Sequence, residues 1–139
     1  MLLPAFTPLL ALTATLFGTV SATPIESNRN PTNLAPRASG RFTWYNPGLG
    51  ACGNWNGDGD LVAALNAADF DPYTPNGNPN NNSLCGRRLR VSYNGKSVDV
   101  TVVDRCPTCN AGDLDLSPAA FEALEPLSTG VIYGSWDWI

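Results

Sequence analysis

The sequence predicts a mainly β protein that folds as a small barrel. Short runs rich in β-branched and aromatic residues recur after residue 40, and the turn dipeptide Asn94-Gly95 joins two of them. One well-marked helix follows late in the chain, between Ser117 and Pro126. Charged residues make up only 14% of the chain, too few for a coiled coil or a solvated helix bundle. Many short strands with a single late helix are typical of a small barrel.

The first segment is expected to be a signal peptide rather than part of the fold. Residues 1–22 carry no charge, and the small residues Ser21 and Ala22 end an apolar run, which predicts cleavage before Thr23. The alternative is a signal anchor, but the run is short for a membrane span and is broken by Pro4 and Pro8. We therefore expect a secreted protein of the extracellular space or the cell wall.

Two further regions complete the predicted organisation. Residues 23–39 are polar and rich in Pro and Asn, so they are expected to form a flexible leader or a pro-segment. Residues 40–139 are expected to form one folded domain.

The predicted strands begin with 42–45, a β-rich run ended by Asn-Pro-Gly. The apolar run 61–65 has the length of a buried strand, and a short helical turn is expected over 66–70. Runs 88–93 and 96–104 form a hairpin, because Asn-Gly favours a two-residue type I′ turn. A last strand is expected over 131–139.

The predicted helix has clear signals at both ends. Ser117 is the expected N-cap and Pro118 occupies the first helical position, while Pro126 ends the helix. Phe121 and Leu124 form its apolar face.

The net charge of −4 argues against nucleic acid or an anionic membrane as the partner. The chain contains no His, which removes the commonest general base and all His-ligated metal sites. We expect no metal, no cofactor and a monomeric protein.

Four cysteines in a secreted chain predict two disulfides. The favoured pairing joins Cys52 to Cys85 and closes a local bridge between Cys106 and Cys109. A redox role for the Cys-Pro-Thr-Cys segment remains open but lacks a thioredoxin-like context. A zinc site would require all four thiols and leave no disulfide.

Four segments together carry a resemblance to a known family: 45–53, 82–87, 101–109 and 113–121. In this order they resemble secreted fungal proteins with an RlpA-like double-psi β-barrel. That superfamily also includes the first domain of expansins, barwin, kiwellins and the family-45 endoglucanases. The resemblance implies a six-stranded barrel with one or two short helices and an open groove on one side. It also suggests the Cys52–Cys85 bridge.

The same resemblance points to groove residues. Asp104 and Asp115 match the two groove aspartates of the expansin first domain, Thr43 matches a groove threonine, and Asp115 matches the catalytic acid of family-45 enzymes. A purely structural alternative is open for both carboxylates, because Asp104 can accept backbone N–H groups and Asp115 lies before a helix. Tyr45 and Trp55 are the aromatic candidates for the groove, and Trp55 is expected to be exposed because its neighbours are Asn and Gly.

An enzyme is the less favoured hypothesis. Family-45 enzymes take their base from the segment that matches 42–52, and this segment holds Asn46 but no Asp or Glu. RlpA-type lytic transglycosylases use an Asp with a His, which the chain lacks.

Three functions therefore remain. The first is non-catalytic binding of a cell-wall polysaccharide or a partner protein through the groove. The second is weak glycan cleavage, of endoglucanase or lytic type, with Asp115 as the acid. The third is a secreted interaction protein such as a cysteine-protease inhibitor, contacting its partner through loops 46–60 and 72–83. The sequon at Asn81 predicts a glycan in the second of these loops.

Overall fold

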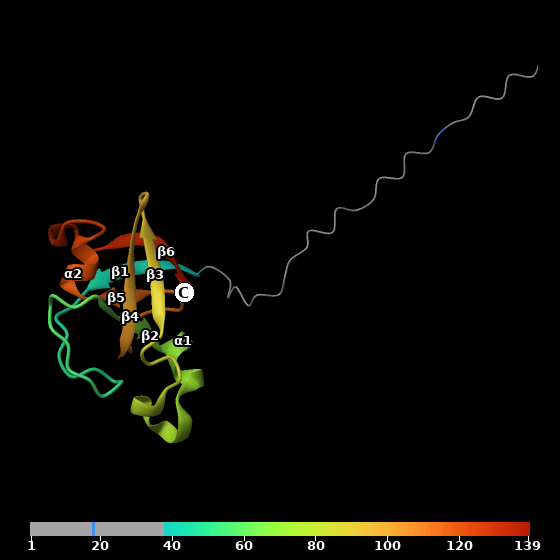
Figure 1. Ribbon diagram of the computed structural model, residues 1–139, viewed down its shortest axis with the longest axis vertical. Coiled ribbons are helices and arrows are strands. Elements are labelled where there is room, and N and C mark those ends of the chain that lie inside the picture. Colours follow the sequence, from blue (N-terminus) through green and yellow to red (C-terminus); the bar gives the residue numbers. More distant parts are fainter. Residues whose placement is uncertain (1–17, 19–37) are drawn as a thin grey trace, which may run out of the picture. The chain divides into compact units, whose positions relative to one another are not determined.

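The computed structural model describes Gly18 and residues 38–139. The predictions for residues 1–22 and 23–37 lie outside the described residues, apart from Gly18. The described residues form six strands that close into a barrel in the order β1-β5-β2-β4-β3-β6. This confirms the predicted six-stranded mainly β fold (Figure 1).

The bounds of the elements follow the sequence patterns closely. The strands are β1 (Ala38–Trp44), β2 (Val62–Asn66), β3 (Arg88–Tyr93), β4 (Lys96–Cys106), β5 (Leu114–Leu116) and β6 (Ile132–Trp138). The short helices are α1 (Ala67–Phe70) and α2 (Pro118–Glu122), with 3-10 turns η1 (Asp71–Tyr73), η2 (Pro75–Gly77), η3 (Pro79–Asn81) and η4 (Leu127–Thr129). Strand β1 begins at Ala38, two residues before the expected start of the domain.

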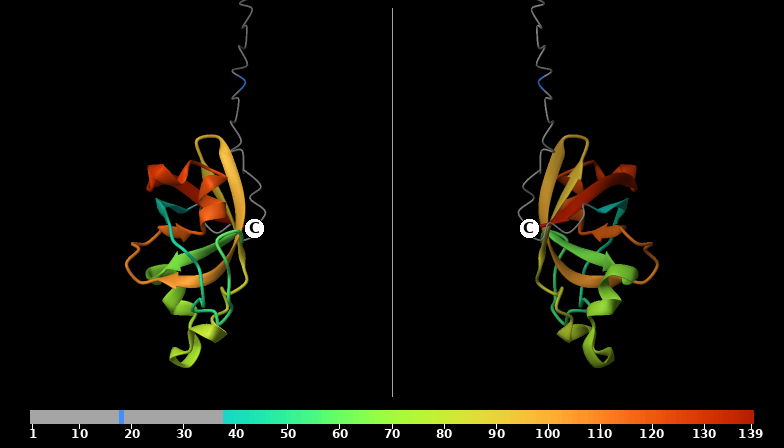
Figure 2. Two further views of the ribbon diagram at one scale, coloured as in Figure 1. Left: turned by 90° about the vertical axis from the view of Figure 1, so that its left-hand side faces the viewer. Right: turned by 90° about the vertical axis from the view of Figure 1, so that its right-hand side faces the viewer.

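Strand pairing in the barrel is mixed. Pairs β1/β5 and β2/β4 are parallel, while β1/β6, β2/β5, β3/β4 and β3/β6 are antiparallel. The β3–β4 hairpin turns at Asn94 and Gly95, which both have positive φ, as a type I′ turn requires. The hairpin tip lies at one end of the barrel and the 3-10 turns η1–η3 lie at the other (Figure 2).

The barrel interior is filled by alternate side chains of the strands, together with the helices. Phe42, Phe70 and Phe121 are fully buried in this core. Helix α2 begins where predicted, because the Ser117 Oγ accepts a hydrogen bond from the Ala120 amide. Trp136 lies in the core at 4% exposure, whereas Tyr93 and Trp138 are only partly buried and pack against the core.

Both predicted disulfides are present in the described part of the chain. Cys52 bonds to Cys85 and Cys106 bonds to Cys109. The first bridge closes a long loop between the segment after β1 and the segment before β3, so it constrains two of the longest irregular regions. The second staples the turn that follows β4. With all four thiols oxidised, the zinc alternative is wrong.

Candidate functional site

Four residues from four neighbouring strands lie at one level of the barrel. Thr43 pairs with Asp115 across β1 and β5, and Asp115 pairs with Ala64 across β5 and β2. Ala64 in turn pairs with Asp104 across β2 and β4. We call Thr43, Asp115, Ala64 and Asp104 the polar row. Directly paired residues point to the same face of a sheet, so the row forms one continuous strip.

The polar row faces away from the barrel core. Residues next to it along the strands, such as Phe42, Ala63 and Leu114, are fully buried in the core cluster. Because side chains alternate along a strand, the row residues project from the opposite face. Adjacent strands are about 4.8 Å apart, which separates the Cα atoms of Asp104 and Asp115 by roughly 10 Å across Ala64. Ala64, which lies between the two carboxylates in the row, is itself buried at 3% exposure.

A β-bulge brings Asp104 onto this face. The register between β2 and β4 shifts so that Val102 pairs with Ala63 and Asp104 with Ala64, leaving Val103 unpaired. Val102 and Val103 are both buried. Simple alternation along β4 would have placed Asp104 in phase with the inward valines, and the extra residue reverses that phase.

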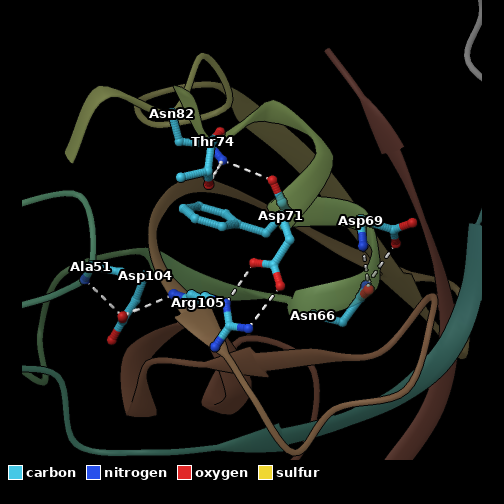
Figure 3. Close-up of polar contacts among 9 residues, drawn as sticks. Ala51, Asn66, Asp69, Asp71, Thr74, Asn82, Asp104 and Arg105 are labelled. Atoms are coloured by element: carbon cyan, nitrogen blue, oxygen red, sulfur yellow. Dashed lines mark hydrogen bonds and ion pairs between the residues drawn. The ribbon is translucent and has the colours of Figure 1, made fainter. Parts of the chain in front are cut away.

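Asp104 also holds a loop in place. Its Oδ1 atom accepts hydrogen bonds from the backbone amides of Ala51 and Arg105, each at 2.8 Å (Figure 3). Ala51 belongs to the loop between β1 and β2, so the carboxylate attaches this loop to the end of β4. The structural role considered for Asp104 is therefore present, while Oδ2 points away from both amides.

Asp115 has a different environment. The Thr43 hydroxyl donates a 2.9 Å hydrogen bond to its Oδ1 atom. Burial raises the pKa of the Asp115 carboxyl, and the hydrogen bond from Thr43 and the Arg41 charge lower this pKa. The Asp104 charge raises it again, and the resulting pKa of Asp115 lies above the usual value. Asp115 lies on β5 and the cap of α2 is Ser117, so Asp115 does not cap the helix, contrary to the alternative drawn from its sequence position.

Tyr45 reaches the same carboxylates from the end of β1. Its amide donates to the Leu116 carbonyl, which extends the β1/β5 pairing beyond Trp44. Its hydroxyl oxygen is buried and makes no hydrogen bond of good geometry, although Asp104 lies close enough to affect it. Burial first, and then the charges of Asp104 and Asp115, raise the pKa of this phenol. It therefore stays protonated at neutral pH, and from its buried position it can donate only towards the neighbouring carboxylates.

Trp55 is separate from this cluster. It is 77% exposed, as expected, and pairs with Leu49 through an isolated β-bridge in the loop between β1 and β2. The structure thus brings Thr43, Tyr45, Asp104 and Asp115 together and leaves Trp55 on the adjoining loop.

The carboxylates of this loop are engaged by the loop itself. Asp58 accepts a hydrogen bond from the Asn46 side chain, and Asp60 accepts from the side chain of Asn56 and the amide of Gly57. The Gly57 amide is the main cause that lowers the pKa of Asp60. These contacts order the loop and engage both of its carboxylates. Among the described residues, no group of three His, Cys, Asp or Glu side chains is arranged to hold a metal ion.

Asn81 and Asn82 divide their roles in the second loop. Asn81 is exposed in η3, in a position open to modification. Asn82 is 4% exposed, and its side chain donates to the Phe70 carbonyl and to the Thr74 hydroxyl and accepts from the Leu84 amide. This buried amide fixes the 71–85 segment, which bears the second half of the Cys52–Cys85 bridge.

Sequence reasoning missed two residues of this region. Ala64 was only part of an apolar run, and nothing in that run indicates which alanine separates two carboxylates. Arg41 is exposed on β1 two residues before Thr43, a spacing that places both on the same face. Its charge lowers the pKa of Asp115, so it belongs to the electrostatic surroundings of the row.

A sequence model of the family described as "Lytic transglycolase" matches residues 37–136, which is nearly the whole barrel. The chain belongs to this family. Its members share the double-psi β-barrel that the sequence motifs indicate. Membership concerns the fold and does not establish lytic activity for this chain.

The individual relatives include proteins described with different functions. A papain inhibitor of Streptomyces mobaraensis is 40% identical over 110 residues, covering 76% of this chain and 74% of that protein. The structure of the Streptomyces papain inhibitor superposes with a TM-score of 0.69, at 40% identity and with 77% and 97% of the two chains covered. A Clavibacter michiganensis expansin, solved as a mutant in complex with cellohexaose, gives a TM-score of 0.62 at 26% identity, and the match covers 74% of this chain and 50% of the expansin.

Allergen-type proteins are a third group of relatives. An Asp f 7 homolog of Arthroderma benhamiae is 36% identical over 87 residues, which is 62% of this chain but only 28% of that protein. The matched region is thus a minor part of that relative.

Proposed function

We propose that this protein is a secreted, monomeric, non-catalytic barrel that binds a cell-wall polysaccharide through the polar row and Tyr45. The observation that carries the proposal is the convergence of Thr43, Asp104 and Asp115 on one outward strip of four strands, with the buried Tyr45 hydroxyl beside the two carboxylates. Carboxylates and a hydroxyl suit the hydroxyl-rich surface of a sugar chain, because carboxylates accept from sugar hydroxyls and the threonine hydroxyl can donate or accept. Two disulfides are consistent with secretion.

Binding without cleavage is supported by the state of the acids. Glycoside hydrolysis usually needs an acid and a second carboxylate as base or nucleophile. The raised pKa of Asp115 suits an acid, but one oxygen of Asp104 is occupied by two backbone amides. The chain contains no His that could take the part of a base.

The binding proposal is tested by retention on insoluble cellulose, chitin and peptidoglycan. We expect the wild type to be retained on one of them and Asp104→Asn and Asp115→Asn to be released. Glu122→Gln is the matched control, because Glu122 is exposed on α2 and undergoes the same change of carboxylate to amide. Absence of retention on all three polymers, or equal retention of all variants, would refute the proposal.

The same variants decide the enzymatic alternative. Release of reducing ends or anhydro-sugars from a soluble glycan, abolished in Asp115→Asn, would establish cleavage with Asp115 as the acid. No release between about pH 3 and pH 8, a range that spans ordinary carboxyl and imidazole pKa values, would exclude it.

A second candidate function is inhibition of a papain-like cysteine protease. The specific observation in its favour is the similarity to papain inhibitors over most of both chains. The loop between β1 and β2 exposes two large apolar side chains, Leu49 at 60% and Trp55 at 77%, on a segment fixed by the Cys52–Cys85 bridge. A fixed loop with an exposed Trp loses little conformational entropy on binding a protein.

Inhibition of papain by the purified protein tests this candidate. We expect Trp55→Ala to weaken inhibition at least tenfold, in the range of an aromatic interface anchor. Tyr133→Ala is the control, since Tyr133 is 72% exposed but lies on β6 rather than in the loop. Lack of inhibition by the wild type would end the proposal for papain.

A further inference from the structure

An open depression of about 600 Å³ lies beside the polar row. It is lined by parts of β1 and β6 and by the turn that follows the Cys106–Cys109 bridge; its walls include Gly40, Arg41, Asn110, Tyr133 and Gly134. Gly40 and Gly134 are paired across β1 and β6 and add no side chains to the walls. Arg41 and Tyr133 therefore supply its largest side chains.

Arg41 and Tyr133 are direct cross-strand partners. They pair between β1 and β6, so their side chains share one face and start about 5 Å apart. Both residues are exposed, Tyr133 at 72%. The ring of Tyr133 is free of ring stacking and of cation-π contact within residues 38–139, where the recorded cation-π pair is Arg87 with Trp138. Its face is thus open for stacking on a planar or apolar surface.

The guanidinium of Arg41 has no ion-pair partner among residues 38–139. Other arginines there are engaged: Arg90 and Arg88 with Asp99, Arg105 with Asp71, and Arg87 over Trp138. Asp113, the acid that lines the depression, is buried, and its two oxygens accept hydrogen bonds from the backbone amides of Arg41 and Asn110. Arg41 therefore presents an unused fork of donors to the depression, in a geometry that matches a carboxylate.

The depression continues the polar row. Arg41 stands two residues before Thr43 on the same strand, and its charge acts on Asp115, which is the next residue of the row. Tyr133, Arg41, Thr43 and Asp115 thus follow one another across β6, β1 and β5. A ligand long enough to cover the polar row also reaches the depression, whereas a single sugar covers either the row or the depression.

From this arrangement we infer that the depression is a subsite for a carboxylate-bearing sugar unit of the bound polysaccharide. The Arg41 guanidinium binds the carboxylate in a bidentate manner and the Tyr133 ring stacks against the sugar face. Neutral units lie along Thr43, Asp115 and Asp104, where the two carboxylates would repel a second negative charge. The inference rests on the proposed polysaccharide function. It adds that the polysaccharide carries carboxylates and that one of them lies at Arg41.

The test compares two forms of one polymer: regenerated cellulose, and the same cellulose with part of its C6 hydroxymethyl groups oxidised to carboxylates. We expect the wild type to bind the oxidised form roughly five to ten times more tightly, the size of an exposed charge-assisted contact. This preference should shrink as salt is raised. It should disappear in Arg41→Gln and weaken in Tyr133→Ser. Arg88→Gln is the control, since it removes one exposed arginine charge from β3, outside the depression.

The outcomes separate the inference from the proposal beneath it. Equal binding to both polymers, with loss in Asp115→Asn, would overturn the carboxylate subsite and leave glycan binding standing. A preference that survives in Arg41→Gln, or falls equally in Arg88→Gln, would show a general charge effect and also overturn it. Failure of the wild type to bind either polymer would refute both for this glycan backbone.

Discussion

Asp104 combines a structural contact with a proposed binding role, and two substitutions separate them. Its Oδ1 accepts the amides of Ala51 and Arg105, each at 2.8 Å, while Oδ2 points away from both. Asp104→Asn keeps an oxygen in place for both amides but removes the charge. Asp104→Ala removes the acceptor entirely.

The expected magnitudes follow from these contacts. A hydrogen bond to a charged acceptor contributes about 1.5–3 kcal/mol. Two such bonds at a half-exposed position stay at the low end, because the freed amides can bind water, so Asp104→Ala should lower the free energy of unfolding by about 2–3 kcal/mol. For a barrel of this size that corresponds to a fall in Tm of roughly 10–20 °C. Asp104→Asn should cost less than about 1 kcal/mol, because hydrogen bonds to a neutral acceptor are only modestly weaker.

Urea unfolding with both disulfides intact measures these changes, and retention on the bound polymer measures the binding role. We expect Asp104→Asn to remain nearly as stable as the wild type and to lose retention. If Asp104→Asn were as unstable as Asp104→Ala, the charge itself would be needed for folding. If Asp104→Ala kept its stability, the contact with Ala51 would not hold the loop.

The remaining predictions concern Asp115 and the disulfides. Because its folded-state pKa is raised, ionisation of Asp115 opposes folding, and stability falls as pH rises through that pKa. Asp115→Asn should therefore be more stable than the wild type at pH 7, and this gain in stability should vanish towards pH 3. Urea unfolding across this pH range measures it. A gain in stability that is independent of pH would contradict the reasoning. Replacing Cys52 and Cys85 by Ser should cost about 3.5 kcal/mol, because 33 residues separate them. The same change at Cys106 and Cys109, only 3 residues apart, should cost about 2 kcal/mol. Thermal unfolding of the two double variants measures the difference in stability. Equal losses would show that loop closure is not the origin of the stabilisation.

The local signals in the sequence were sufficient for most of the fold. Asn94-Gly95 specified its hairpin because few residues accept positive φ at both turn positions. Ser117 and Pro118 specified the start of α2 through capping and a preset φ. No local sequence signal predicts the parallel pairing of β1 with β5 and of β2 with β4, because these pairs join segments that are distant in the chain. The family resemblance, rather than periodicity, supplied that part of the topology.

The site was only partly predictable, for the same reason. Thr43, Tyr45, Asp104 and Asp115 came from matched motifs, and the structure places them together. In the sequence, two adjacent buried valines are compatible with a continuous strand and with a bulged one. The bulge that turns Asp104 to the outer face could therefore not be predicted. Buried Asn82 was equally hidden, because in sequence it is one more Asn in a polar loop.

The bulge at Val103 connects the two candidate functions physically. Its carbonyl accepts the amide of Cys52, and Gly50 lies so close to that carbonyl that a side chain there would collide with it. The loop that exposes Trp55 is thus docked on the same distortion that turns Asp104 outward, and Asp104 itself bonds to Ala51 in that loop. A polysaccharide on the polar row and a protease on the loop would both depend on one carboxylate. Substitution of Asp104 is therefore expected to affect both activities, whereas substitution of Trp55 distinguishes them.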